Sequence, residues 1–288
     1  MTMYHILLIL RLCCCTGCVL GVATLLRGSE SQAQDEPQAK ERLEFMKAEV
    51  DSFELESSEL RPKAAFTFVS KPLLRYSDPT RGGGTANEAE PNVLLDAGVW
   101  RLGTEGRPTA LVTIEIYREP DGSRMLAYEF LSLSETKFSL KHKTKNIRWD
   151  PAGSALDWKE LPDAPKPAAA AAARLAQMRQ LTRRFVAKER INKVPIECRL
   201  LTQPIDRYQS AAEKIVDGAI FAYANGTNPE LGVVFESDGE RWRYGIVRLT
   251  AAESSVTLDG RQVAAFERSR TRVTDPYHNA AHKIEMDK

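Results

Sequence analysis

The sequence predicts an α+β fold, mainly antiparallel β, in which two pseudo-repeated β-rich halves are joined by a long Ala-rich helix. Three observations predict it. Short alternating segments follow one another closely, and this spacing favours antiparallel pairing, because parallel neighbours need a crossover of about a dozen residues or more. One alanine-rich stretch has helical periodicity. The segment Asp217–Glu236 also aligns without a gap on Asp96–Glu115.

Residues 1–33 have the pattern of a secretory signal peptide. Arg11 precedes an apolar run, Leu12 to Leu26, and Ser31-Gln32-Ala33 places small side chains before a cleavage point after Ala33. The run is shorter than the roughly 20 residues that span a bilayer. We therefore predict a secreted or periplasmic protein. An uncleaved N-terminal membrane anchor and lipid attachment at Cys18 remain alternatives.

Composition limits the disulfide bonds and the binding partners that the mature chain could have. Of the 5 cysteines, only Cys198 follows the export segment, so we expect no internal disulfide. The chain has 40 basic and 39 acidic residues. A nearly neutral protein has no global field to recruit nucleic acid or an anionic membrane. We expect no nucleic-acid partner, and membrane contact only through the N-terminal segment if it stays uncleaved.

The mature chain divides into five predicted regions. Residues 34–60 predict a short helix and a lead-in strand, and residues 61–150 predict the first β-rich half, with a hairpin signal at Asp121-Gly122. A Pro-rich linker and helix follow at 151–195, then the second β-rich half at 196–267. Residues 268–288 are polar, and we expect a C-terminal tail there.

The Ala-rich segment within 168–193 predicts an amphipathic helix. Six alanines are followed by apolar side chains at spacings of three and four, which are Leu175, Met178, Leu181 and Phe185. The remaining positions carry basic residues, including Arg174. They could bind an anion or a membrane surface, but we interpret them as the solvated face of a helix that packs against a sheet.

The sequence match extends beyond its first segment and predicts an internal duplication. Pro204-x-x-Arg207-Tyr208 matches Pro72-x-x-Arg75-Tyr76, and the following matches keep the same order: Asp217 with Asp96, Phe221 with Trp100, Pro229 with Pro108, Tyr244 with Tyr128. A single small sheet cannot bury both faces, so each half is expected to complete the core of the other. The alternative is two unrelated hairpins with similar patterning.

These same segments carry a resemblance. "KPLLRYSDPTRG", "DAGVWRLGTEGRPTALVTIEIY", "YEFLSLS", "ARLAQMRQLTRRF", "CRLLTQPIDRY" and "DGAIFAYANGTNPE" resemble a family of secreted planctomycetal proteins of unknown function. The likeness covers about Phe66 to Glu236. It implies a bacterial envelope or extracellular setting, and it supplies no catalytic residues to carry over.

The duplicated polar residues are the candidate ligand-binding set: Arg75, Tyr76, Asp96, Arg207, Tyr208 and Asp217. They could line a cleft between the halves and bind a ligand. Alternatively, each arginine pairs with the aspartate of its own half, because buried charges must be paired and a duplicated fold would repeat such a pair. We predict the second arrangement.

Other reactive residues give no catalytic, metal or cofactor prediction. His278, His282 and Glu285 would share one face of a helix, but they lie in the polar tail, so we expect no metal site. His142 lies between two lysines and is expected on an exposed strand. The apolar neighbours of Cys198 predict a buried strand thiol.

The function that these observations favour is a secreted, non-catalytic binding or structural protein of the bacterial cell envelope. Its partner would be an envelope protein or polymer. The alternative from another class is an extracellular hydrolase that uses Asp/Glu pairs, so whether the protein is an enzyme stays open. Carboxylates about 5–10 Å apart in a cleft would favour the hydrolase, and a closed core would favour the binding protein.

Overall fold

The computed structural model describes residues 23–57, 59–60, 65–83, 92–270 and 272–285. The chain forms two compact units, residues 1–41 and 42–288. Helix α1 (Ala23–Asp51) begins in the first unit and ends in the second. The apolar part of the predicted signal peptide lies largely outside the described residues, so its cleavage stays a prediction. None of the helices in the described ranges has both the length and the apolar content needed to cross a membrane.

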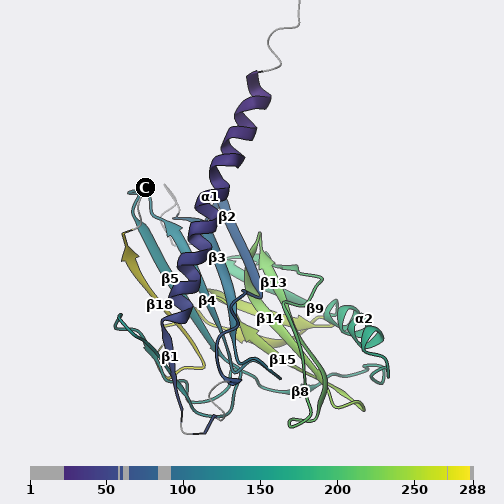
Figure 1. Cartoon of the computed structure of the whole chain (residues 1–288). Helices are drawn as coiled ribbons and strands as arrows, with labels where there is room; N and C mark the ends of the chain where they lie inside the picture. The colour runs from purple at the N-terminus through teal and green to yellow at the C-terminus, as the bar shows by residue number, and fades with distance from the viewer. Residues whose placement is uncertain (1–22, 58, 61–64, 84–91, 271, 286–288) are drawn as a thin grey trace, which may run out of the picture. The chain divides into compact units, whose positions relative to one another are not determined.

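The described residues form mostly antiparallel β-structure, as predicted, in two larger and two smaller sheets (Figure 1). Sheet I has the order β18-β5-β4-β3-β2, and sheet II has the order β11-β13-β14-β15-β8, with β12 also on β13. Sheet I consists of β2 (Leu74–Gly83), β3 (Asn92–Leu102), β4 (Ala110–Arg118), β5 (Arg124–Ser132) and β18 (Tyr277–Ile284). Sheet II consists of β8 (Lys159–Glu160), β11 (Arg199–Leu200), β12 (Asp206–Ser210), β13 (Ile215–Asn225), β14 (Asn228–Ser237) and β15 (Trp242–Arg248).

Two smaller sheets complete the strand content. Their strands are β1 (Phe53–Glu56), β6 (Ser139–His142) and β7 (Arg148–Trp149) in the first, and β9 (Phe185–Ile191), β10 (Val194–Glu197), β16 (Glu253–Leu258) and β17 (Arg261–Phe266) in the second. The strand β1 was expected within the lead-in segment. Each smaller sheet covers the outer side of one larger sheet, because its apolar residues belong to the same buried clusters.

Sheets I and II face each other across a common apolar cluster. Val99 and Leu111 from sheet I meet Ile220, Val234 and Val247 from sheet II in this cluster. Side chains alternate along a strand, so the next residues point to the opposite faces. The two large sheets therefore bury both faces, and the space between them is filled by side chains.

The outer face of each large sheet is covered by a helix as well as by a small sheet. On sheet I, Trp100 and Ile114 share a cluster with Met46 near the end of α1. On sheet II, Phe221 shares a cluster with Met178 of helix α2 (Ala171–Thr182). Figure 1 shows α2 beside the green strands of sheet II.

The residues that match in sequence occupy the same register in the two sheets. Tyr76 lies opposite Ala97, and Tyr208 lies opposite Gly218. Farther into the sheets the corresponding pairs are Trp100 with Val112 and Phe221 with Val233, then Ile114 with Tyr128 and Phe235 with Tyr244. Matched residues thus lie on corresponding strands and point to corresponding faces.

Two predicted elements differ from the structure. Helix α2 ends at Thr182, whereas the helical pattern was extended to residue 193; from Phe185 the burial alternates with a period of two, and the chain forms β9. The expected polar tail contains β18, which pairs with β5 along its whole length. Tyr277 on this strand packs into the cluster between the large sheets. This buried aromatic contact holds the strand in place although most of its residues are polar.

Candidate functional site

The two predicted Arg–Asp pairs are both present. Arg75 donates from Nε to Asp96 at 2.9 Å and from Nη2 at 2.5 Å. Arg207 donates to Asp217 in the same way, at 2.9 and 2.7 Å. Two parallel N–H···O bonds fix the direction of a guanidinium as well as its position. The prediction that each arginine pairs within its own half is confirmed.

Each aspartate also binds an arginine from the covering helix, which the sequence analysis did not anticipate. Arg42 of α1 donates to Asp96 at 3.2 Å, and Arg174 of α2 donates to Asp217 at 2.8 Å. Arg174 is buried, so its interpretation as part of a solvated face was wrong. A signal was present, because Arg174 precedes the buried Met178 by four residues and therefore shares its helix face.

The six candidate binding residues are not gathered in one cleft. Asp96 and Asp217 lie on the outer faces of different sheets, under α1 and α2 respectively. The tyrosines next to the paired arginines, Tyr76 and Tyr208, point the other way, into the cluster between the sheets. A ligand at one aspartate would therefore be separated from the other by both sheets.

Each inward tyrosine donates a hydrogen bond to a glutamate two strands away in the same sheet. The Tyr76 hydroxyl donates to Glu115 at 3.0 Å, and the Tyr208 hydroxyl donates to Glu236 at 2.8 Å. Burial strongly raises the pKa of both tyrosines, and the adjacent carboxylate raises it further. Glu115 and Glu236 are the final residues of the original sequence match, yet the sequence analysis did not select them.

The surroundings of Glu115 favour the protonated acid. Burial raises its pKa, although the hydroxyls of Tyr117 and Tyr76 donate to it and partly oppose the shift. Glu129, which accepts from Tyr277 at 2.7 Å, has its pKa raised by burial and by the charge of Glu115. Neighbouring buried carboxyls thus hinder each other's ionisation.

Glu236 differs from Glu115 because two guanidinium groups bind it. Arg107 donates to its two oxygens at 2.6 and 3.1 Å, and Arg243 donates to Oε2 at 2.6 and 3.1 Å. Both guanidinium carbons lie over the ring of Trp158, at 5.3 Å for Arg107 and 4.4 Å for Arg243. Such cation–π contacts hold the indole ring and the guanidinium groups together.

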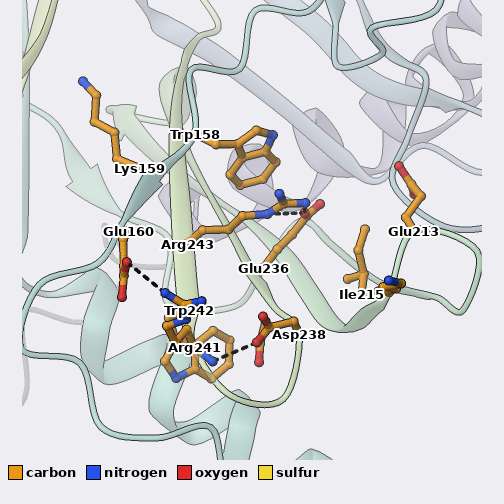
Figure 2. A pocket seen from close by; sticks show the side chains of 12 residues that line it. Trp158, Lys159, Glu160, Glu213, Ile215, Glu236, Asp238, Arg241, Trp242 and Arg243 are labelled. Atoms are coloured by element: carbon orange, nitrogen blue, oxygen red, sulfur yellow. Dashed lines mark hydrogen bonds and ion pairs between the residues drawn. The ribbon is translucent and has the colours of Figure 1, made fainter.

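A pocket of about 370 Å³ opens beside this group (Figure 2). Figure 2 shows Trp158 next to the guanidinium of Arg243, with Glu236 reaching the same guanidinium from the other side. The lining also includes three segments around sheet II: Lys159 and Glu160 of β8, Glu213, Lys214 and Ile215 before and at the start of β13, and Ser237, Asp238, Arg241 and Trp242 around the β14–β15 turn. It is the candidate functional site, since it combines an aromatic ring with charged side chains.

A second polar cluster lies where α1 ends against sheet I. His142 accepts at Nδ1 from the amides of Thr144 (3.2 Å) and Lys145 (3.1 Å), so its Nε2 carries the hydrogen and faces Glu49 at 3.3 Å. Lys145 and Tyr128 both donate to the same Glu49 oxygen at 2.5 Å. His142 is 2 % exposed, so its prediction as an exposed strand residue was wrong.

The other predicted reactive groups are structural. His278 and His282 lie on one face of strand β18, not on a helix, and they stack on Phe130 and Tyr128 of β5. Among the described residues, no group of three or more His, Cys, Asp or Glu is placed to hold a metal ion. Cys198 is a buried free thiol, as predicted, but it lies between β10 and β11 and not within a strand; burial raises its pKa to about 12.

Three histidines, of which His142 and His278 are buried and His282 is half-buried, should make stability fall in mild acid. Burial lowers the pKa of His142, His278 and His282, so each stays neutral in the folded protein below the unfolded value of about 6.5. Their contribution is complete above pH 6.5 and is lost as pH falls through the folded pKa values. We expect the His278→Gln/His282→Gln variant to lose less stability than the parent between pH 7 and 5. Urea unfolding across this range checks it, and equal pH slopes would contradict it.

Comparison with protein-family models, curated proteins and solved structures finds no match to this chain. The class of protein is therefore defined by its fold and its site alone. It has two facing antiparallel sheets, each covered by a helix and a small sheet, with a pocket at sheet II that Trp158 helps to line.

Proposed function

We propose that the protein is an exported, non-catalytic binding or structural protein of the bacterial cell envelope. The observation that carries the proposal is that three buried carboxylates are each bound by two arginines. Asp96, Asp217 and Glu236 each accept hydrogen bonds from two arginines. A hydrolase of the Asp/Glu type needs one carboxyl to give a proton and another to attack or to activate water, with substrate between them. Carboxylates saturated by guanidinium groups are poorly suited to either role.

We also propose that the two halves arose by internal duplication. The matching registers support this, as does the recurrence of an outward Arg–Asp pair, a helix arginine and an inward Tyr–Glu pair in each half. The hairpin turn of each half also contacts a strand of the other half. Thr227 donates from Oγ1 to the Ser77 carbonyl at 2.7 Å, and Gly106 lies against Ser210. Each half thus contacts the edge strand of the other.

The proposal is tested by measuring separately whether the protein binds a cell-wall polymer and whether it cleaves that polymer. The purified protein is incubated with insoluble cell-wall polymer, and both its depletion from solution and the release of soluble reducing ends are measured. We expect retention on the polymer without release above the blank. Release that disappears on replacing one pocket carboxyl, Glu213→Gln, would support the hydrolase instead. Absence of retention would contradict the binding role.

A further inference from the structure

Three carboxyl groups from the two large sheets come together near the β13–β14 turn. Glu115 of β4 and Glu129 of β5 belong to sheet I, and Glu230 of β14 belongs to sheet II. Glu115 and Glu230 are buried, and Glu129 is half-buried. Burial and the charge of Glu189 raise the pKa of Glu230, and the charges of Glu129 and Glu115 raise it further, so the three groups are close enough to interact. Glu115, Glu129 and Glu230 are called the carboxyl cluster below.

Glu230 is placed in the cluster by an irregularity of sheet II. The register between β13 and β14 shifts between the pairs Ala224–Pro229 and Tyr223–Leu231, so Glu230 is an extra residue without a pairing partner on β13. Such a β-bulge redirects a side chain. The Oε2 atom of Glu230 is buried and has no hydrogen-bond partner among the described residues. A buried carboxyl oxygen without a donor favours the protonated, uncharged acid.

The cluster lacks a bound cation. In the part of the chain that the structure describes, Glu115 and Glu129 accept hydrogen bonds from tyrosine hydroxyls, and no member of the cluster forms an ion pair. The charge of Arg248 lowers the pKa of Glu129 without overcoming burial, but its Nε, Nη1 and Nη2 atoms all donate to main-chain carbonyls. The other titratable groups that face the cluster are Tyr76 of β2, Tyr117 of β4, Tyr277 of β18 and Glu189 of β9.

The absence of a cation is explained by the sequence of the β13–β14 turn. The gapless match of the two halves puts Asn228 at the position of Arg107. In sheet II, Arg107 supplies the positive charge for the buried Glu236. At the equivalent place beside Glu115, the turn supplies the amide of Asn228 and a further carboxyl instead.

The opposite end, at the β3–β4 turn, is joined to sheet II by ion pairs. Arg107 binds Glu236 with Nε at 2.6 Å. Arg101 binds Asp206 at 2.7 Å, and both of these side chains are 8 % exposed. The two ends of the facing sheets are therefore held together by different chemistry.

We propose that the carboxyl cluster is a pH-dependent switch, which keeps the β13–β14 end of the two sheets closed while its members hold protons and loosens that end when they ionise. Ionisation would place like charges from both sheets beside each other, away from water and without a counter-cation. The Arg107–Glu236 and Arg101–Asp206 pairs keep the other end closed. The inference does not depend on the proposed envelope-binding role.

The direction of the pH effect follows from the raised pKa values. Burial raises the pKa of Glu129 and Glu230 well above the unfolded value of about 4.3. A carboxyl with a raised folded pKa contributes its full stabilisation below the unfolded pKa, and this contribution is lost as pH rises through the folded value. Each proton lost in this interval increases the equilibrium constant for opening by up to about ten-fold per pH unit. The cluster therefore favours the closed form in acid and the loosened form in base.

Carboxyl titration by NMR tests the protonation directly. The full chain is labelled with ¹³C at the glutamate carboxyl carbon, and the shifts are followed from pH 4 to pH 9. The variants Glu129→Gln and Glu230→Gln assign two signals, because each removes one. We expect both groups to titrate well above about 4.3 in the parent, and the remaining one to titrate lower in each variant, because a neighbouring like charge is gone. Midpoints near 4.3 for both groups would overturn the proposal.

Amide hydrogen exchange tests the loosening. Protection factors, corrected for the intrinsic effect of pH, are compared for residues 226–231 and for the matched residues 105–110. Between pH 6 and pH 9 the parent should lose protection by about ten-fold or more at 226–231 and little at 105–110. Glu230→Gln should keep its protection at 226–231. Glu240→Gln, at an exposed ion pair with Lys166, should behave as the parent does.

The remaining outcomes separate a local switch from general effects. An equal loss of protection at both turns would indicate overall unfolding and would overturn the switch. A loss at 226–231 that persists unchanged in both Glu129→Gln and Glu230→Gln would show that other groups cause it. Retention on cell-wall polymer together with pH-independent exchange would overturn the switch while leaving the envelope-binding role intact.

Discussion

Replacing Asp217 with alanine should destabilise the protein by about 3–5 kcal/mol. Asp217 is 0 % exposed and accepts hydrogen bonds from Arg174 and Arg207. Its removal leaves the buried Arg174 guanidinium without its counter-charge, although the carbonyls of Ala168 and Ala169 still accept from Nη1. Because whole domains are stable by only about 5–15 kcal/mol, this loss would be a large part of the total.

Urea unfolding of four variants measures this effect and its origin. Glu240→Ala removes an exposed ion pair with Lys166 and should change stability by less than about 1 kcal/mol. Arg207→Ala should be destabilising, and the Asp217→Ala/Arg207→Ala double variant should lose less than the sum of the two single losses, because the residues are coupled. A loss below about 1 kcal/mol for Asp217→Ala would contradict the structural role of the pair.

The Arg–Asp pairs could be predicted because both members recur in the aligned segments. A buried charge needs a partner, and a repeated sequence restricts the choice to residues that recur with it. The helix arginines required one further step, since Arg42 and Arg174 precede buried methionines by four residues on their helices. Helical periodicity identifies the buried face of a helix, but it does not show whether a charged side chain on that face will find a partner in the core.

The pocket could not be predicted, because its parts are distant in sequence. Trp158 lies in a Pro-rich segment and Arg107 lies in the β3–β4 turn. Arg107 binds Glu236 of sheet II and lies over the Trp158 ring. Only the packing of sheet I against sheet II brings these residues together. The end of α2 and the strand β18 were missed for a related reason, since tertiary contacts override local helical or polar composition there.

The matched residues Glu115 and Glu236 should lose very different amounts of stability on the same substitution. Both are buried between the sheets and both accept from a tyrosine. Glu236→Gln should cost about 3–5 kcal/mol, because Arg107, in a buried site, would keep only its longer contact with the partly exposed Glu213. Glu115→Gln should change stability by no more than about 1 kcal/mol, since burial already raises the pKa of this carboxyl and an uncharged amide is easier to bury.

Urea unfolding of the two glutamine variants at pH 7 compares the positions directly. The substitution is the same and the strand register is equivalent, so the difference between the losses reports mainly the arginines around Glu236. Trp158 fluorescence adds a local readout, because freeing Arg107 and Arg243 from Glu236 should loosen their contacts with the indole ring. Equal losses at the two positions would mean that the arginines contribute nothing beyond the tyrosine hydrogen bond. A large loss only at Glu236 would show that its two arginines make this buried carboxylate important for stability, whereas the equivalent carboxyl in sheet I is not.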